Sequence, residues 1–288
     1  MNLDFLDEDC LSHILSFTSP RDATCVSLVS PVLRSSADSD KVWDKFLPHD
    51  YQDILSRLIS PLEYSSKKDL FLRLCNPHFV DGGRKIFSIE KATGKKRYML
   101  SARELSITWA DHPLYWCWKP LSQSRLILSQ SRFSEVVELR TICWLEIKAK
   151  INTKMLSPRT QYGAYLIMKL ADRAYGLDTL PSEVSLEVGN FKSQGVAYLR
   201  RKVKHKQALK GVCILNRIDR IAAPRADEIQ GSIPCRERED GWIEIKLGSF
   251  YNDGSDDKDV KMCLKEVTGE HLKGGLIVEG LELRPKPS

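Results

Sequence analysis

The spacing of the hydrophobic residues changes at about residue 84, and no other feature constrains the fold of this chain as strongly. Upstream, apolar residues recur three and four positions apart, as Leu11, Ile14 and Leu15 do, which is the period of an amphipathic helix. Downstream they alternate with polar residues, as Leu145 and Ile147 do, which is the period of a half-buried strand. The chain has 288 residues, so we predict an α+β multidomain protein in which a small helical domain precedes a larger β-domain.

Three short helices are predicted in residues 1–48. The first follows the acidic stretch DEDC, because acidic residues favour a helix N-terminus. The second starts in TSPRDA, where Ser19 is the expected N-cap and Pro20 the first helical residue, and it carries Val29 and Leu33 on one side. The third lies in DSDKVWDKFLP and ends at its proline.

Helices in so short a segment bury little apolar surface among themselves. Their apolar stripe therefore needs a cover, and periodicity leaves two alternatives open, a partner protein or the downstream domain of the same chain. Residues 49–81 are predicted to form a helical linker, with helices in YQDILSRLI and SSKKDLFLRLC. The stretch NPHFVDGGRK contains Asn, Pro and two glycines, which are typical of a turn, and we expect it to end the linker.

Residues 82–288 are predicted to form the β-domain. The segments CWLEIKAKI, SLEVG, GVCIL and GWIEIKLGSF have the two-residue period, with Gly, Pro or Asp-Gly turns between strands. Short strands at regular spacing indicate an antiparallel sandwich or barrel. SARELSI is expected to be a helical exception within this domain.

Composition and motifs exclude several classes of function. The net charge of +6 is too small for a dedicated nucleic-acid-binding protein, and no apolar run reaches the roughly 18–20 residues that span a bilayer. The basic run RRKVKHK is interpreted as a solvated loop or strand face, with a localisation signal or an anion-binding patch as the alternative. Motifs of serine hydrolases, P-loop proteins, dinucleotide-binding proteins and zinc proteases are absent. We therefore expect no catalytic residue, no metal site, no cofactor and no membrane or nucleic-acid partner.

An aromatic cluster is the one constellation that stands out for binding. The segment ITWADHPLYWCWKP contains Trp109, Tyr115, Trp116 and Trp118, and so holds three of the six tryptophans of the chain. Two interpretations remain open, a set of core residues or a platform that stacks on sugars, nucleobases or proline-rich peptides. Trp116 and Trp118 are two positions apart in a strand-like stretch, so they face the same side.

The first 48 residues resemble an F-box. The resemblance rests on the opening Leu–acid–x–Leu–x–x–Ile–Leu, on the Ser-Pro-Arg-Asp step between helices and on the late Trp43. It departs at Asp7, where F-boxes usually have proline, and this change is expected to weaken adaptor binding without abolishing it. The resemblance implies that these helices bind a Skp1-like protein. The implied contact residues are Leu6, Leu11, Ile14, Leu15, Pro20, Val26, Val29 and Trp43.

Residues 82–285 resemble the phloem-protein-2 family, whose lectin members are similar to the tobacco agglutinin that binds GlcNAc oligomers. The resemblance rests on the segments SARELSITWADHPLYWCWKPL, SRFSEVVELRTICWLEIKAKI, YGAYLIMKLADRAYGLD and DGWIEIKLGSFYND. It implies a jelly-roll-like β-sandwich and a sugar site. The implied contacts are two tryptophans seven residues apart, Trp109 and Trp116, and two acidic residues seven apart, Glu237 and Glu244. Trp118 is expected to be structural support.

One duplication sets this chain apart from the family pattern. LSQSR occurs at residues 121–125 and again at 128–132, where the family has a single Ser-Arg-Phe-Ser-Glu segment. The seven added residues lie next to the implied sugar site in the sequence and would reshape or occlude it.

Together, the two resemblances imply a plant protein with an F-box followed by a phloem-protein-2 lectin domain. The implied function is that of a substrate-receptor subunit of an SCF-type (Skp1–cullin–F-box) ubiquitin ligase in the cytoplasm and nucleus. Its partners would be a Skp1-like adaptor, through it a cullin, and a glycan or glycoprotein target. The alternatives are a stand-alone nucleocytoplasmic lectin, an F-box adaptor whose β-domain binds protein, and a glycoside hydrolase that uses the acidic residues.

Overall fold

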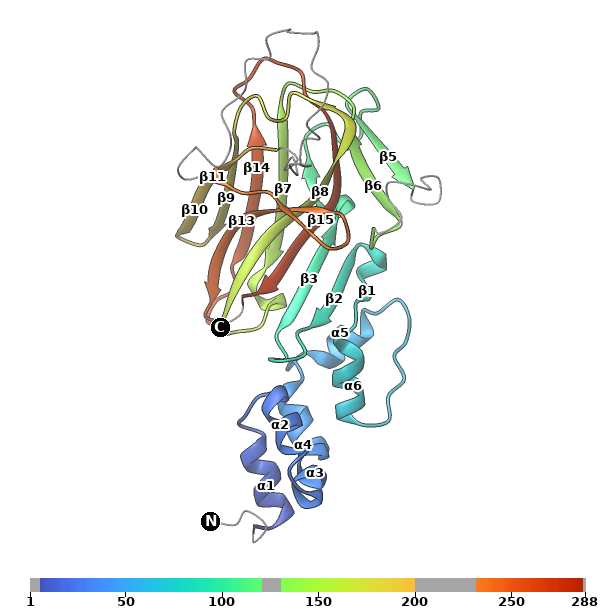
Figure 1. Cartoon of the computed structure of the whole chain (residues 1–288), viewed down its shortest axis with the longest axis vertical. Coiled ribbons are helices and arrows are strands. Elements are labelled where there is room, and N and C mark those ends of the chain that lie inside the picture. The colour runs from blue at the N-terminus through green and yellow to red at the C-terminus, as the bar shows by residue number, and fades with distance from the viewer. Residues whose placement is uncertain (1–5, 121–130, 200–231, 287–288) are drawn as a thin grey trace, which may run out of the picture.

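The structure is a computed structural model that describes residues 6–120, 131–199 and 232–286. Helices occupy one end of an elongated molecule and two β-sheets occupy the other (Figure 1). The segments GVCIL and RRKVKHK and most of the LSQSR duplication lie outside the described residues. No helix within the described ranges has the length and apolar character needed to cross a membrane.

Six helices form the N-terminal part of the described chain. Their bounds are α1 Glu8–Leu15, α2 Pro20–Val26, α3 Pro31–Asp38, α4 Asp40–Phe46, α5 Tyr51–Ser56 and α6 Lys67–Leu74. Side-chain caps begin several of them: the Asp7 carboxylate accepts the Cys10 N–H at 2.6 Å, and the Ser19 hydroxyl accepts the Asp22 N–H at 3.1 Å. The predicted N-cap at Ser19 is thus confirmed.

The prediction of three helices in the first 48 residues is wrong, because the second one is split into α2 and α3. Ser30 caps α3 by accepting the Leu33 N–H at 3.2 Å, and Pro31 is its first residue. A proline cannot donate to the preceding turn and its ring clashes with that turn, so α2 ends before it. Val29 and Leu33 consequently lie on different elements, Val29 exposed in the turn and Leu33 buried in α3.

The N-terminal helices share a core with the linker helix α6. Trp43 packs edge-on against Phe71 with ring centroids 5.1 Å apart, and its indole N–H donates to the Ala37 carbonyl at 2.7 Å. The same hydrophobic cluster continues into the β-domain through Val80 and Phe87. Part of the apolar stripe is therefore covered by downstream residues of the same chain, which was one of the two alternatives; the other was a partner protein.

Fifteen strands follow in the described chain and form two sheets. The nine-stranded sheet has the order β1-β2-β3-β15-β8-β13-β12, with β6 also pairing β15 and β5 pairing β6. The six-stranded sheet has the order β11-β10-β9-β14-β7-β4, and all pairs except β10–β11 are antiparallel. The bounds are β1 His78–Val80, β2 Lys85–Ile89, β3 Lys96–Ser101, β4 Ser106–Ile107, β5 Trp116–Pro120, β6 Glu135–Leu139, β7 Leu145–Asn152, β8 Thr160–Tyr175, β9 Ser182–Val188, β10 Phe191–Ala197, β11 Ser232–Ile233, β12 Arg236–Glu237, β13 Ile243–Asn252, β14 Asp259–Glu266 and β15 Gly274–Pro285.

The predicted alternation is confirmed in both sheets. Leu145 and Ile147 of β7 are buried between the sheets, and so are Ile243 and Ile245 of β13. This burial of one face of each sheet against the other confirms the predicted β-sandwich.

NPHFVDGGRK contains the predicted turn at Asp81–Gly83 and also the strand β1, which pairs with β2 and buries Val80. The Arg57 guanidinium of the linker donates two hydrogen bonds to the Asp81 carboxylate in this turn, at 2.8 and 2.9 Å. SARELSI forms only the 3-10 turn Ala102–Glu104 before β4, since its last residues pair with β7.

Candidate functional site

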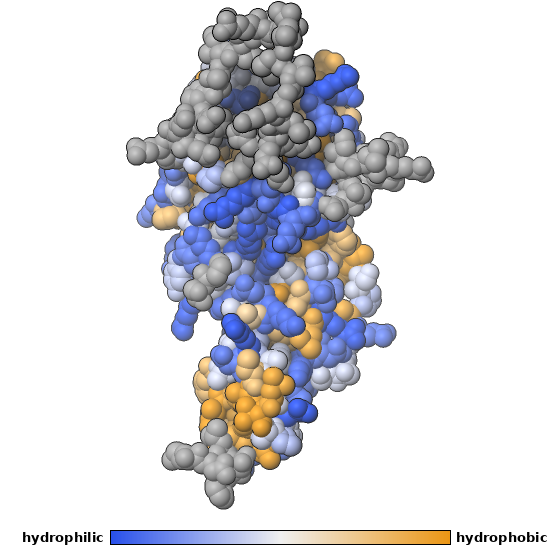
Figure 2. Space-filling model, in the orientation of Figure 1, coloured by the Kyte–Doolittle hydropathy of each residue, from blue (hydrophilic) through white to orange (hydrophobic). Residues whose placement is uncertain are grey.

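An exposed apolar patch lies on the N-terminal helices. Six apolar side chains of this region are each at least 40% exposed although a complete core lies beneath them, and Figure 2 shows hydrophobic side chains gathered over these helices. We call them the apolar patch: Leu6, Ile14, Phe17, Leu28, Val29 and Val32. Contiguous apolar surface of this kind on a folded domain marks an interaction site.

The adaptor contacts implied by the sequence divide between this patch and the core. Leu6, Ile14 and Val29 are in the patch. Leu11, Leu15, Pro20 and Trp43 are buried, and Val26 is partly buried against the core.

The expectation that the buried members contact a partner is corrected, because their side chains hold the helices to one another. Phe17 and Leu28 were missed as surface residues. The break at Pro31 was the available signal for Leu28, since it places this residue in the turn between α2 and α3.

The aromatic cluster forms a loop between β4 and β5 that displays one tryptophan. The Trp116 indole N–H donates to the Thr108 carbonyl at 3.0 Å, and the Trp118 indole N–H donates to the Ala110 carbonyl at 3.1 Å. Trp109, between these two carbonyls, has φ +58 and is 50% exposed. A bulky residue in the left-handed region is a strained position that the surroundings must enforce.

Trp109 and Trp116 therefore have different surroundings. Trp109 packs against Tyr115 with tilted rings whose centroids are 5.2 Å apart, and half of its surface stays exposed. Trp116 is 2% exposed and belongs to the hydrophobic core, so it offers no face to a sugar, and the expectation that it is a contact is corrected. Trp118 is half-buried with the Arg103 guanidinium 3.5 Å from its ring centroid, an arrangement that suits a supporting role.

The two acidic residues of the implied sugar site lie on opposite faces of the nine-stranded sheet. Glu237 of β12 pairs across the strands with Ile243, whose side chain enters the core, whereas Glu244 of β13 pairs with Arg236. Directly opposed residues share a face, so Glu237 and Glu244 do not. Strands β6, β15 and β8 separate β5 from β13 in the sheet order, so the structure does not bring the tryptophans and these carboxylates together.

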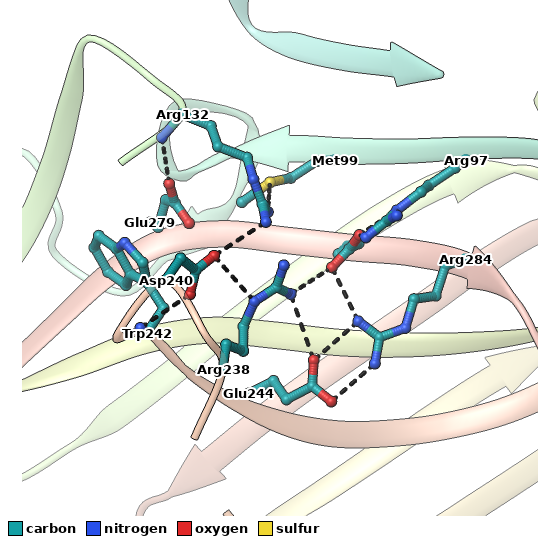
Figure 3. Close-up of polar contacts among 10 residues, drawn as sticks. Arg97, Met99, Arg132, Arg238, Asp240, Trp242, Glu244, Glu279 and Arg284 are labelled. Atoms are coloured by element: carbon teal, nitrogen blue, oxygen red, sulfur yellow. Dashed lines mark hydrogen bonds and ion pairs between the residues drawn. The ribbon is translucent and has the colours of Figure 1, made fainter. Parts of the chain in front are cut away.

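Glu244 belongs instead to a network of arginines and carboxylates on the outer face of this sheet (Figure 3). Arg284 contacts both oxygens of Glu244 at 2.8 and 2.9 Å, and Arg238 donates to Glu282 at 2.7 Å. Arg97 also pairs with Glu282. We call these five residues the arginine network.

The charges within the arginine network satisfy one another. Glu282 is 1% exposed, and burial raises the pKa of its carboxyl group, but Arg97, Arg238 and Arg284 outweigh burial and lower it overall. Glu244 is 7% exposed and both of its oxygens are bound by Arg284, so a sugar hydroxyl cannot reach it without breaking this pair, and the expectation of a sugar contact is corrected for Glu244 as well.

A second polar surface is the hollow of about 870 Å³ over the outer face of the six-stranded sheet. Lysine and glutamate side chains alternate there and pair with one another. Lys148 pairs with Glu146 of the same strand at 2.9 Å, and Lys265 pairs with Glu183 of the neighbouring strand at 3.1 Å. Among the described residues that line this hollow there is no aromatic ring to stack on a ligand. No group of three or more His, Cys, Asp or Glu side chains in the described ranges is arranged to hold a metal ion.

Comparison with known proteins identifies two family matches. The F-box domain family matches residues 3–45, and the phloem protein 2 family matches residues 95–285. F-box protein PP2-B15 of Arabidopsis thaliana is 48% identical over 287 residues, which are 98% of this chain and 96% of that protein. F-box protein PP2-B13 and F-box protein VBF of the same plant are each 44% identical and cover 98% of this chain, and the matches take in 98% and 99% of those proteins.

Proposed function

This chain belongs to the F-box proteins of the phloem protein 2 type, and on that premise we propose that it is a substrate-receptor subunit of an SCF-type ubiquitin ligase. Its N-terminal helices bind a Skp1-like adaptor and, through it, a cullin. Its β-domain binds the target. The protein itself does no chemistry, and it accelerates ubiquitin transfer by holding target and ligase together at high effective concentration.

The apolar patch is the observation that carries the adaptor half of this proposal. The helices already have a core that includes Leu15 and Trp43, so the exposure of Phe17, Leu28 and Val29 does not result from poor packing. Burying such side chains against the apolar groove of a partner is worth about 25 cal/mol per Å² of apolar surface removed from water. An amphipathic helical surface in a groove is a common recognition mode.

Asp7 is compatible with adaptor binding. Its carboxylate accepts the Cys10 N–H at 2.6 Å, so it begins α1 as an N-cap where the family usually has proline. This hydrogen bond also holds the pKa of the Asp7 carboxyl below its usual value, so the cap stays charged to lower pH than a free aspartate would. The direction of α1 is thus set without proline.

The adaptor claim is tested by size-exclusion chromatography of the full chain mixed with a purified Skp1-like adaptor. Co-elution as one complex that also recruits a cullin supports the receptor function. If the two proteins elute separately at micromolar concentration, the chain acts as a stand-alone lectin instead, in the cytoplasm or nucleus.

The exposed ring of Trp109 is the part of the β-domain that we propose as the target contact, with a GlcNAc-containing glycan as ligand. The exposure of its ring, its constrained backbone and its position in a loop suit stacking on the apolar face of a sugar ring. Because Trp116 and Glu244 are unavailable, this site is built around one tryptophan.

A glycan array probed with the full chain, Trp109→Ala and Trp144→Ala tests the sugar claim. Trp144 is 46% exposed at the start of β7 and serves as the matched control. Signal that disappears only with Trp109→Ala supports a glycan ligand. Without any glycan signal the loop is a protein-recognition surface. Hydrolysis of chito-oligomers by the chain would restore the glycoside hydrolase alternative.

A further inference from the structure

A cleft of about 640 Å³ opens where the F-box helices meet the β-domain. Its lining comes from four segments, residues 16–20, 45–50, 93–96 and 154–158. The first two belong to the helical end and the other two to the β-domain, and Figure 1 shows the turn between β2 and β3 reaching toward the helices. The cleft is therefore built jointly by the two functional halves of the chain.

Close contacts hold the two walls together. Gly94, in the turn between β2 and β3, has φ +69, and a Cβ there would lie 2.6 Å from the Phe46 carbonyl oxygen at the end of α4. Lys96 is 5% exposed and its ammonium pairs with Asp50 at 2.7 Å. The junction is thus packed and ion-paired, so the cleft is a defined feature of the fold.

The lining carries an excess of positive charge. Its lysines are Lys45, Lys95, Lys96 and Lys154, and Asp50 is its one acidic residue among the described residues. Lys96 is neutralised by Asp50, and Lys154 by Asp257 at 2.7 Å. Within the described ranges no carboxylate lies within 4.0 Å of the ammonium groups of Lys45 and Lys95, so these two charges are left over.

Lys95 is held close to a second cation without a neutralising acid. Burial lowers the pKa of its ammonium group, and the neighbouring Arg159 lowers it further. Arg159 directly follows the lining residue Pro158 and is one of three non-glycine residues with positive φ in the described chain, at φ +49. Strained backbone and unpaired like charges at one cleft are features of binding sites rather than of structural contacts.

We propose that this cleft binds a small, soluble, phosphate-bearing anion between Lys45 of the F-box and Lys95 of the β-domain. Lysine is a common phosphate ligand, and charge-assisted hydrogen bonds to phosphate are stronger than neutral ones. The volume is in the usual range of about 300–1,000 Å³ for a small-molecule site. A bound polyanion would offset the repulsion among the leftover cations.

Binding there would couple the two halves of the receptor. The ligand would contact the end of α4 and the turn between β2 and β3 at once, so it would stabilise one orientation of the target-binding domain relative to the ligase. This inference does not depend on the identity of the target or on the adaptor.

Pyrophosphate is the probe for this site, used with the full chain at constant ionic strength set by chloride. Isothermal titration and thermal unfolding are compared for wild type, Lys45→Gln, Lys95→Gln and the double variant. Lys91→Gln is the matched control, because Lys91 is an exposed lysine of the same turn that does not line the cleft. Each cleft lysine is expected to contribute about tenfold in affinity.

The expected result is that wild type and Lys91→Gln bind pyrophosphate and gain thermal stability, while the double variant loses both responses. No heat and no stabilisation in wild type, or responses that persist in the double variant, would overturn the proposal. Binding to phosphoinositide-containing vesicles without any response to pyrophosphate would also overturn it, since the ligand would then be a lipid headgroup. Val29→Asp should keep the pyrophosphate response even if it loses the adaptor, so the two claims fail separately.

Discussion

Trp116 donates its indole hydrogen to the carbonyl oxygen of Thr108 at 3.0 Å, and so fixes from within the core the residue that precedes Trp109. Trp118 does the same for Ala110 on the other side at 3.1 Å. Two inner tryptophans thus hold the backbone that displays a third. The cluster is neither wholly core nor wholly surface, and Trp116 and Trp118 act through the position that they give to Trp109.

Replacing the indole of Trp116 tests this arrangement. Trp116→Phe keeps an aromatic ring in the core but removes the N–H that Thr108 accepts, so we expect a loss of about 1–3 kcal/mol in the free energy of unfolding. Urea denaturation measures the loss. Trp144→Phe, at an exposed position, should leave the stability within about 0.5 kcal/mol. Equal effects of the two changes would contradict the role given to the Trp116 hydrogen bond.

Because Glu282 pairs with several arginines of the arginine network, replacing it is expected to lower the free energy of unfolding strongly. Glu282→Gln removes a buried carboxylate that pairs with Arg97 and Arg238. Arg238 keeps its contacts with Asp240 and Glu244, so we expect a loss of about 3 kcal/mol, the lower end of the cost of breaking a buried pair. The matched control is Glu135→Gln, because Glu135 pairs with Arg103 near the surface and exposed pairs contribute about 1 kcal/mol or less. Guanidinium denaturation that ranks the two variants equally would rule out a buried network.

The lowered pKa of Asp81 leads us to expect that the protein loses stability in acid. The hydrogen bonds of Asp81 to Arg57 lower the pKa of its carboxyl group to about 2. Because the folded-state pKa lies below the unfolded value, the stabilisation is fully present above pH about 4 and is lost as the pH falls toward 2. The contribution is about 2 kcal/mol by linkage, and it ties the linker helix α5 to the β-domain.

Asp81→Asn should reduce stability at pH 7 and flatten its dependence between pH 4 and 2, measured by urea unfolding at each pH. Asn tolerates the φ of +53 at this position, so backbone strain does not confuse the comparison. Asp53→Asn is the control, since Asp53 is a weaker and more exposed partner of the same arginine at 3.4 Å. An unchanged acid profile in Asp81→Asn would show that this ion pair does not link the segments.

Gly94 and Gly82 form a matched pair for testing the junction between the F-box and the β-domain. Both have positive φ, +69 and +66, but a Cβ at Gly82 would meet nothing within 4 Å, whereas one at Gly94 would meet the Phe46 carbonyl. Gly82→Ala should therefore cost only the backbone strain of about 1–2 kcal/mol. Gly94→Ala should cost more and should increase proteolysis near residue 50. Equal losses in the free energy of unfolding for the two variants would mean that the turn between β2 and β3 is not in close contact with α4.

Features set by local chemistry could be predicted from the sequence. The alternation of apolar and polar residues identified β7 and β13 as strands, and in β7 the burial of side chains alternates as a half-buried strand requires. The cap at Ser19 was equally visible. The split of the second helix could also have been predicted, because Ser30 and Pro31 are typical of a helix start. It was missed because the apolar residues on both sides of this step have the spacing of one continuous helix.

Features set by pairing between distant segments could not be predicted. The seven-residue spacing of Glu237 and Glu244 does not reveal that a turn and a change of strand lie between them, and only the register with Ile243 places them on opposite faces. The arginine network draws Arg97, Arg238 and Arg284 from different strands and turns. Likewise, the two-residue period placed Trp116 and Trp118 on one face of a strand, but it did not indicate whether that face lies toward the core.

The most direct test of the central claim is a titration of a purified Skp1-like adaptor with the full chain, followed by calorimetry. Wild type should bind, and Val29→Asp should weaken binding by about a hundredfold or more, equivalent to about 2.7 kcal/mol, without lowering the unfolding temperature, because Val29 is 74% exposed. Leu272→Asp, at an apolar residue 59% exposed in the β-domain, is the control and should bind as wild type does. Leu15→Asp is unsuitable, because Leu15 is in the helical core. Val29→Asp binding with wild-type affinity would contradict the assignment of the apolar patch as the ligase contact.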